Sequence, residues 1–170
     1  MSEVFAEQII KSKASPKEVG ARIMIIMALI MVIMAIPKLA VMGLGMVGFV
    51  LFFVCAYLTY YVFKITNIEF EYSVVNTDFY VEKIMGQIKR KKCRVFNLRQ
   101  AVVIASEKSE KVRQYLDGEQ VYDYSSRDRK NERFVAVFNS DKGVEVMFFE
   151  PNEKITNALK SVVRPSIYSE

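Results

Sequence analysis

Hydrophobic and polar residues are distributed unevenly along this chain of 170 residues. Residues 19–63 contain only two charged side chains, Arg22 and Lys38, whereas residues 64–170 contain 19 basic and 16 acidic side chains. Residues 39–63 form an uncharged run of 25 residues, and a helix needs about 20 to cross a bilayer core of roughly 30 Å. The pattern therefore predicts a membrane segment followed by a polar domain.

The first apolar run, residues 23–36, is too short to span a bilayer alone, but its start is clearly marked. Ser15-Pro16-Lys17-Glu18 fits a capping box, with Ser15 as the N-cap and Pro16 as the first helical residue. A helix over 16–36 would be about 31 Å long. Because Pro37 disfavours helix at the residue before it, we predict a transmembrane hairpin over 15–63, with helices at 16–36 and 39–63.

The charges that flank the hairpin predict its orientation. Basic residues precede the first helix and follow the second, whereas Lys38 alone occupies the expected turn. The positive-inside rule then places both termini in the cytoplasm of a multi-pass plasma-membrane protein. Residues 1–14 mix apolar and charged side chains, so we expect either a short interfacial helix or a frayed tail.

Residues 64–170 show the two-residue alternation of strands. Residues 68–73 alternate apolar and polar side chains, and residues 134–149 form the clearest hairpin, with its turn at 139–143. A helix is expected after Pro151, because apolar side chains recur there with helical spacing. We predict an α+β cytoplasmic domain of seven short antiparallel strands and a C-terminal helix.

Two stretches carry a resemblance to a known fold: YSVVNTDFYVEKIMGQIKRKKCRVFNLRQAVVIAS at 72–106, and FFEPNEKITNALKSV at 148–162. Their order of strands, turns and final helix resembles a pleckstrin-homology (PH) domain, and more narrowly the bacterial PH-like domains that follow a two-helix membrane hairpin. The resemblance implies a fold and a membrane location. It does not carry over an inositol-phosphate site, because the first strand turn has no charge except Asp78.

The strongest local charge lies between Lys83 and Arg99, where seven basic residues occur without an acidic one. This run has two interpretations: a solvated strand edge that blocks aggregation, or a surface that contacts anionic lipid. Nucleic acid is not expected as a partner, because the run lacks a recognition motif and the rest of the domain is acidic. The candidate anionic-membrane contacts are Lys89, Arg90, Lys91, Lys92 and Arg94.

Methionines in the first apolar run follow helical spacing, at Met24, Met27, Met31 and Met34. We interpret them as a helix-packing face, directed either at the second helix or at another protomer. A copper site is disfavoured, because thioethers are weak ligands and the chain has no histidine. Glu69 and Glu71 are expected to face solvent as alternating strand residues. No metal, cofactor or catalytic residue is predicted, and an enzyme is the least favoured class.

The sequence therefore favours a membrane-anchored binding or scaffolding module that recruits a protein partner and contacts anionic lipid through the basic strand. The alternative is an accessory subunit of a transporter or envelope complex that docks through its hairpin. The lipid bilayer and an unidentified membrane or cytoplasmic protein are the expected partners, and homo-oligomerisation stays open.

Overall fold

The computed structural model describes residues 5–116, 120–128, 130–140 and 143–169. The chain forms two compact units. Residues 14–68 form a helical hairpin, whereas residues up to Lys13 join residues 69–170 in a β-rich domain. The predicted α+β class, with two apolar helices before β-sheets and a final helix, is confirmed.

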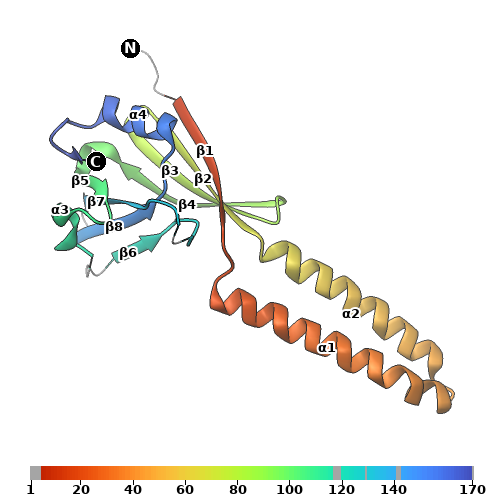
Figure 1. Ribbon diagram of the computed structural model, residues 1–170. Coiled ribbons are helices and arrows are strands. Elements are labelled where there is room, and N and C mark those ends of the chain that lie inside the picture. The colour runs from red at the N-terminus through yellow and green to blue at the C-terminus, as the bar shows by residue number, and fades with distance from the viewer. Residues whose placement is uncertain (1–4, 117–119, 129, 141–142, 170) are drawn as a thin grey trace. The chain divides into compact units, whose positions relative to one another are not determined.

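The helical unit contains α1 (Pro16–Val41) and α2 (Gly45–Ile65), which pack against each other (Figure 1). Its predicted capping box is present: the Ser15 hydroxyl accepts from the Glu18 N–H at 3.4 Å, and the Glu18 carboxylate accepts from the Ser15 N–H at 2.6 Å. Both helices are long and apolar enough to cross a membrane.

The turn between the helices does not lie at Pro37-Lys38, so this prediction is wrong. Pro37 lies inside α1, which continues to Val41. Gly43 then adopts a left-handed φ of 77°, and its N–H donates to the Ala40 carbonyl at 3.0 Å. The Leu44 N–H donates to the Leu39 carbonyl at 2.8 Å, which completes a glycine C-cap of the Schellman type. A proline removes one helical hydrogen bond, but this glycine supplies the conformation that ends the helix.

The β-rich domain consists of two sheets (Figure 1). The first has the order β1 (Phe5–Ser12), β2 (Ile68–Val75), β3 (Asp78–Met85) and β4 (Lys89–Asn97). The second has the order β6 (Gln120–Asp123), β8 (Gly143–Phe149), β7 (Phe134–Ser140), β5 (Ala101–Ser106) and β9 (Tyr168–Ser169). Three helical segments accompany them: η1 (Leu98–Gln100), α3 (Glu110–Arg113) and α4 (Glu153–Val162).

The strand pattern differs from the prediction in two respects. The described residues contain nine strands rather than seven, and β6–β8 and β5–β9 pair in parallel rather than antiparallel. Residues 5–12 form β1 beside β2, so they are neither an interfacial helix nor a frayed tail. The hairpin is thus inserted between two neighbouring strands, and the domain begins before it rather than at residue 64.

Aromatic side chains fill the space between the sheets. Tyr72, Phe79 and Phe149 form three edge or tilted contacts with ring centroids 5.6–6.1 Å apart. Phe96 stacks on Phe138 at 4.8 Å and so joins β4 to β7. Helix α4 buries its predicted apolar stripe and contacts β1 and η1. The contact with α4 and the pairing with β2 make β1 part of the folded domain.

Candidate functional site

The basic strand β4 lies at the edge of the first sheet and contains a β-bulge. Val81 of β3 pairs with Arg94, but Glu82 pairs with Lys92, so Cys93 is the extra residue. Because Val81 is fully buried, its partner Arg94 lies on the inner face of the sheet. Simple alternation would place Arg94 on the same face as Lys92. The bulge reverses this and divides the basic run between two faces.

Arg94 is fixed inside the domain. Its Nε donates to Glu145 Oε2 at 3.0 Å, and its Nη2 donates to Glu145 Oε1. Glu145 in β8 is only 3% exposed, and the Arg94 guanidinium lies 5.0 Å from the centre of the Tyr122 ring. The hydrogen bond with Glu145 raises the pKa of Arg94 above its usual value. Arg94 therefore holds the sheets together, and its predicted role as a lipid contact is wrong.

Arg90 is also paired within the domain. Its Nη1 lies 2.9 Å from Glu71 Oε2, although most of the Arg90 side chain remains exposed. The hydrogen bond between Glu71 and Glu7, followed by burial, raises the pKa of Glu71 despite the nearby Arg90 charge. Glu69 and Glu71 are both buried, which contradicts the expected solvent exposure. β2 lies between β1 and β3, and Glu71 contacts Glu7 of β1 and Arg90 of β4.

The turn between β3 and β4 presents a different surface. Gly86 and Gln87 adopt left-handed φ values of 59° and 58°, and the following Ile88 is 70% exposed. Lys89, Lys91 and Lys92 are exposed beside it, and no acidic side chain among the described residues forms an ion pair with them. We call Ile88, Lys89, Lys91 and Lys92 the tip surface. The sequence analysis did not identify Ile88 as a candidate contact residue. Its position between a Gly-Gln turn and four basic residues could have indicated this role.

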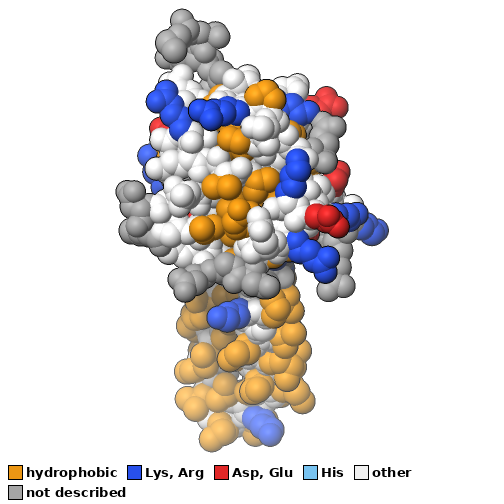
Figure 2. Space-filling view, turned by 90° about the vertical axis from the view of Figure 1, so that its left-hand side faces the viewer, with side chains coloured by type: hydrophobic (Ala, Val, Ile, Leu, Met, Phe, Trp, Pro, Cys, Tyr) orange, Lys and Arg blue, Asp and Glu red, His pale blue; other side chains and the backbone are white. Residues whose placement is uncertain are grey.

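The methionine ladder does not face α2. Met24, Met27, Met31 and Met34 are 50–75% exposed. The helices meet elsewhere, near Gly48, where an added Cβ would lie 3.3 Å from Leu39 Cδ1. The expectation that these methionines pack on the second helix is therefore wrong, and packing against another protomer stays a prediction. Figure 2 shows that hydrophobic side chains cover the visible surface of the hairpin.

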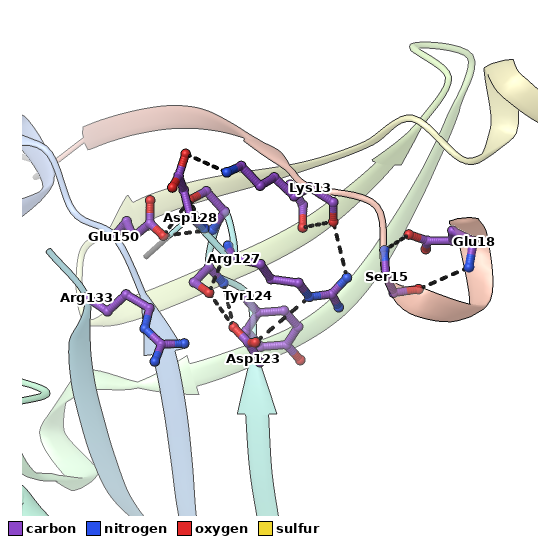
Figure 3. Close-up of polar contacts among 12 residues, drawn as sticks. Lys13, Ser15, Glu18, Asp123, Tyr124, Arg127, Asp128, Arg133 and Glu150 are labelled. Carbon is purple, nitrogen blue, oxygen red and sulfur yellow. Dashed lines mark hydrogen bonds and ion pairs between the residues drawn. The ribbon is translucent and has the colours of Figure 1, made fainter. Parts of the chain in front are cut away.

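A polar cluster missed by the sequence analysis holds the chain that follows β1 (Figure 3). The Lys13 N–H donates to the Ser126 carbonyl at 2.8 Å, and Lys13 Nζ lies 2.9 Å from Asp128 Oδ2. The hydrogen bond from Lys13 lowers the pKa of the Asp128 carboxyl. These contacts fix the last residue of the domain before the hairpin to the loop between β6 and β7.

The buried carboxylate of Glu150 organises the same loop. It accepts from the Ser126 N–H at 2.9 Å, from the Ser126 hydroxyl at 2.7 Å and from Asn131 Nδ2 at 3.0 Å. The Glu150 carbonyl accepts from Gln8 Nε2 of β1 at 2.9 Å. These bonds tie the loop after β6 to β1 and to the end of β8, and the polar run at 123–133 was the sequence signal for them.

The described residues contain no group of three or more His, Cys, Asp and Glu side chains with the arrangement of a metal site. A polar hollow of about 480 Å³ lies beside Ser106 and Lys130. Its Arg133 side chain is already engaged, because it donates to both oxygens of Glu107 at 2.9 and 2.6 Å. Among the described residues, the tip surface combines exposed lysines with an exposed apolar side chain and is the candidate contact surface of the domain.

Comparison with known proteins agrees with this architecture. The model of the family described as bacterial PH-like domain (DUF6106) matches residues 2–169. The matched range includes β1 and both apolar helices as well as the two sheets. Neither the curated proteins nor the solved structures gave a match. The chain therefore belongs to the bacterial PH-like domain family DUF6106.

Proposed function

We propose that this protein is a non-catalytic, membrane-anchored binding module whose tip surface contacts the anionic inner leaflet. In this proposal α1 and α2 span the plasma membrane, and both termini lie in the cytoplasm. The observation that carries the proposal is the exposed Ile88 at the end of a β-hairpin, followed along β4 by the exposed Lys89, Lys91 and Lys92.

The connectivity of the first sheet supports this role. Only residues 66–67 separate α2 from β2, and only residues 13–15 separate β1 from α1. β2 and β3 are hydrogen-bonded neighbours joined by two residues, so they run antiparallel. The turn that follows β3 therefore lies at the end of the sheet where β2 begins. That sheet end is covalently connected to the second apolar helix through two residues.

The charge and apolar content of the tip surface suit a weak, reversible contact. Each lysine near an anionic bilayer contributes about 1 kcal/mol, and the attraction decreases as salt screens it. Full burial of an Ile side chain contributes roughly 1.5–3 kcal/mol more. Because the hairpin already anchors the chain, such a contact would orient the domain rather than recruit it.

An environment-sensitive fluorophore at Ile88→Cys, in a background with Cys55→Ala and Cys93→Ala, tests this contact. We expect an apolar emission shift in vesicles of phosphatidylcholine with phosphatidylglycerol, and a smaller shift in phosphatidylcholine alone or at high salt. Replacing Lys89, Lys91 and Lys92 by Ser should remove the difference between vesicles. As a control, replacing the exposed Lys108, Lys130 and Lys154 by Ser removes the same amount of charge elsewhere. This variant should keep the difference in emission shift between the two vesicle types. Equal emission from both vesicle types would refute the lipid contact.

A second function, as an accessory subunit of a larger membrane complex, is favoured by the exposed methionine face of α1. In that case the hairpin itself would bind neighbouring helices. Exchange of residues 16–65 for an unrelated two-span hairpin separates the two roles. Retained partner crosslinking would support the binding-module role of the domain, whereas lost crosslinking would support the accessory-subunit role.

A further inference from the structure

The edge of strand β5 is covered by the C-terminal tail of the same chain. Tyr168 and Ser169 form β9 and pair in parallel with Ile104 and Ala105. The Ile104 N–H donates to the Ile167 carbonyl at 2.8 Å. β5 has six residues, so this pairing protects only its last part. The edge would otherwise be open to another extended segment.

One aromatic side chain anchors the tail. The Tyr168 ring stacks on Phe134 with centroids 6.1 Å apart, and Lys160 Nζ of α4 lies 5.0 Å from the Tyr168 ring centre. A mainly apolar hollow of about 260 Å³ is lined by Lys160, Pro165 and Tyr168. Strand β5 and helix α4 together therefore hold an extended peptide with an aromatic residue.

The strand pairing of the tail is short. Among the described residues, two residue pairs join β9 to β5, and the contact from Lys111 Nζ to the Ser169 hydroxyl is 3.4 Å long. The Tyr168 hydroxyl is buried without a hydrogen-bond partner among the described residues, which costs free energy relative to a hydrated hydroxyl. A segment that satisfies or lacks this hydroxyl would avoid that cost.

We infer that the β5 edge is a strand-addition site for an extended segment of a partner protein, and that the C-terminal tail occupies it in the absence of that partner. The segment would run parallel to β5, present an aromatic side chain to Phe134, and follow it with a polar or acidic residue near Lys111. Main-chain hydrogen bonds would supply affinity, and the aromatic position would supply specificity.

The surroundings of the tail favour this kind of partner over a second copy of the chain. Only residues 163–167 connect α4 to β9, a length that spans about 17 Å when fully extended. This short connection leads the tail to β5 of its own domain. Figure 2 shows the face of the domain where Figure 1 places the C-terminus and β5, with hydrophobic side chains between lysines or arginines. Apolar side chains in β5 and the tail that are not fully buried are Val102, Pro165, Ile167 and Tyr168.

This inference rests on the proposed role as a binding module. Its test uses no anionic lipid, so a result that refutes lipid contact by the tip surface would not refute strand addition at β5. The purified full chain and a chain that ends at Pro165 are titrated in detergent micelles with a fluorescent peptide, Arg-Pro-Ser-Ile-Tyr-Ser-Glu, which copies residues 164–170. The tail competes at a high effective concentration in the full chain. We expect the shortened chain to bind the peptide at least tenfold more tightly, and a peptide with Tyr168→Ala to lose this binding.

Hydrogen exchange provides an independent readout on the same samples. The Ile104 amide should lose protection in the shortened chain and regain it when the peptide is added. A folded shortened chain that binds the peptide no more tightly than the full chain would overturn the inference. If the shortened chain does not fold, the full chain with Tyr168→Ala decides the question: it should bind the peptide at least threefold more tightly than the unmodified chain, and equal binding would refute the site.

Discussion

Arg94 of β4 and Glu145 of β8 join the two sheets of the domain through a bidentate ion pair, with one hydrogen bond of 3.0 Å between Nε and Oε2. Glu145 is almost completely buried, whereas about 30% of the Arg94 side chain is exposed. Arg94 thus points into the domain, although it lies within the basic run of the sequence. The β-bulge at Cys93 is what turns it inward.

Arg94→Ala should strongly destabilise the domain, because it leaves the Glu145 carboxylate buried and unpaired. Loss of one partner of a buried ion pair costs about 3–5 kcal/mol. Lys91→Ala removes an equal charge from the same strand and should change stability by no more than about 0.5 kcal/mol. Denaturant unfolding followed by circular dichroism compares the two. Similar stability of both variants would show that the ion pair does not hold the sheets together.

Glu71→Gln should stabilise the domain above neutral pH. The raised pKa of Glu71 means that ionisation is unfavourable in the folded state, so its contribution to stability is complete below the ordinary pKa and decreases as pH rises through the raised one. The amide cannot ionise and avoids this loss. Melting temperatures at pH 4 and pH 8 should show a gain of a few °C at pH 8 only. The exposed Glu132→Gln is the matched control, and a gain that is independent of pH would contradict the assignment.

The domain should require β1 to fold. A fragment that begins at residue 64 lacks β1, which exposes the edge of β2 and the side of α4 that contacts β1. We expect this fragment to aggregate, whereas residues 1–13 joined to residues 68–170 by a short Gly-Ser linker should be monomeric and soluble. Size-exclusion chromatography with circular dichroism makes the comparison. A stable monomeric 64–170 fragment would show that β1 is dispensable.

Gly43→Ala should weaken the helical hairpin, because a Cβ is strained at a φ of 77°. The expected cost is roughly 1 kcal/mol. Gly20→Ala adds the same methyl group within α1, where nothing lies within 4 Å of the added Cβ, and should be neutral or stabilising. Detergent-induced unfolding monitored by circular dichroism detects the difference. Equal effects of the two substitutions would place the turn elsewhere.

Local signals in the sequence predicted the features that depend on neighbouring residues. The capping box at Ser15 and Glu18, the antiparallel pair β7–β8 and the amphipathic helix α4 are all present. Each rests on contacts between residues close in the chain or on a simple period. The two apolar helices were similarly evident from length and charge alone, although the turn between them lies at Gly43 rather than at Pro37.

Features that depend on distant residues were not visible. β1 is separated from β2 by the whole hairpin, and its Phe5 and Ile9 remain exposed, so its pattern resembled an interfacial segment. Arg94 and Glu145 are 51 residues apart, and only the bulge brings them together. The basic run consequently appeared as one surface, whereas the structure divides it into internal ion pairs and the tip surface.

Side-specific labelling tests whether the hairpin spans the membrane and presents the domain to the cytoplasm. In a background with Cys55→Ala and Cys93→Ala, single cysteines are introduced by Met42→Cys at the end of α1 and by Lys130→Cys in the domain; both positions are exposed. A membrane-impermeant maleimide should label the Met42→Cys chain in intact spheroplasts, and the Lys130→Cys chain only after lysis. Labelling of the domain in intact spheroplasts, or of the Met42→Cys chain only after lysis, would contradict this membrane topology.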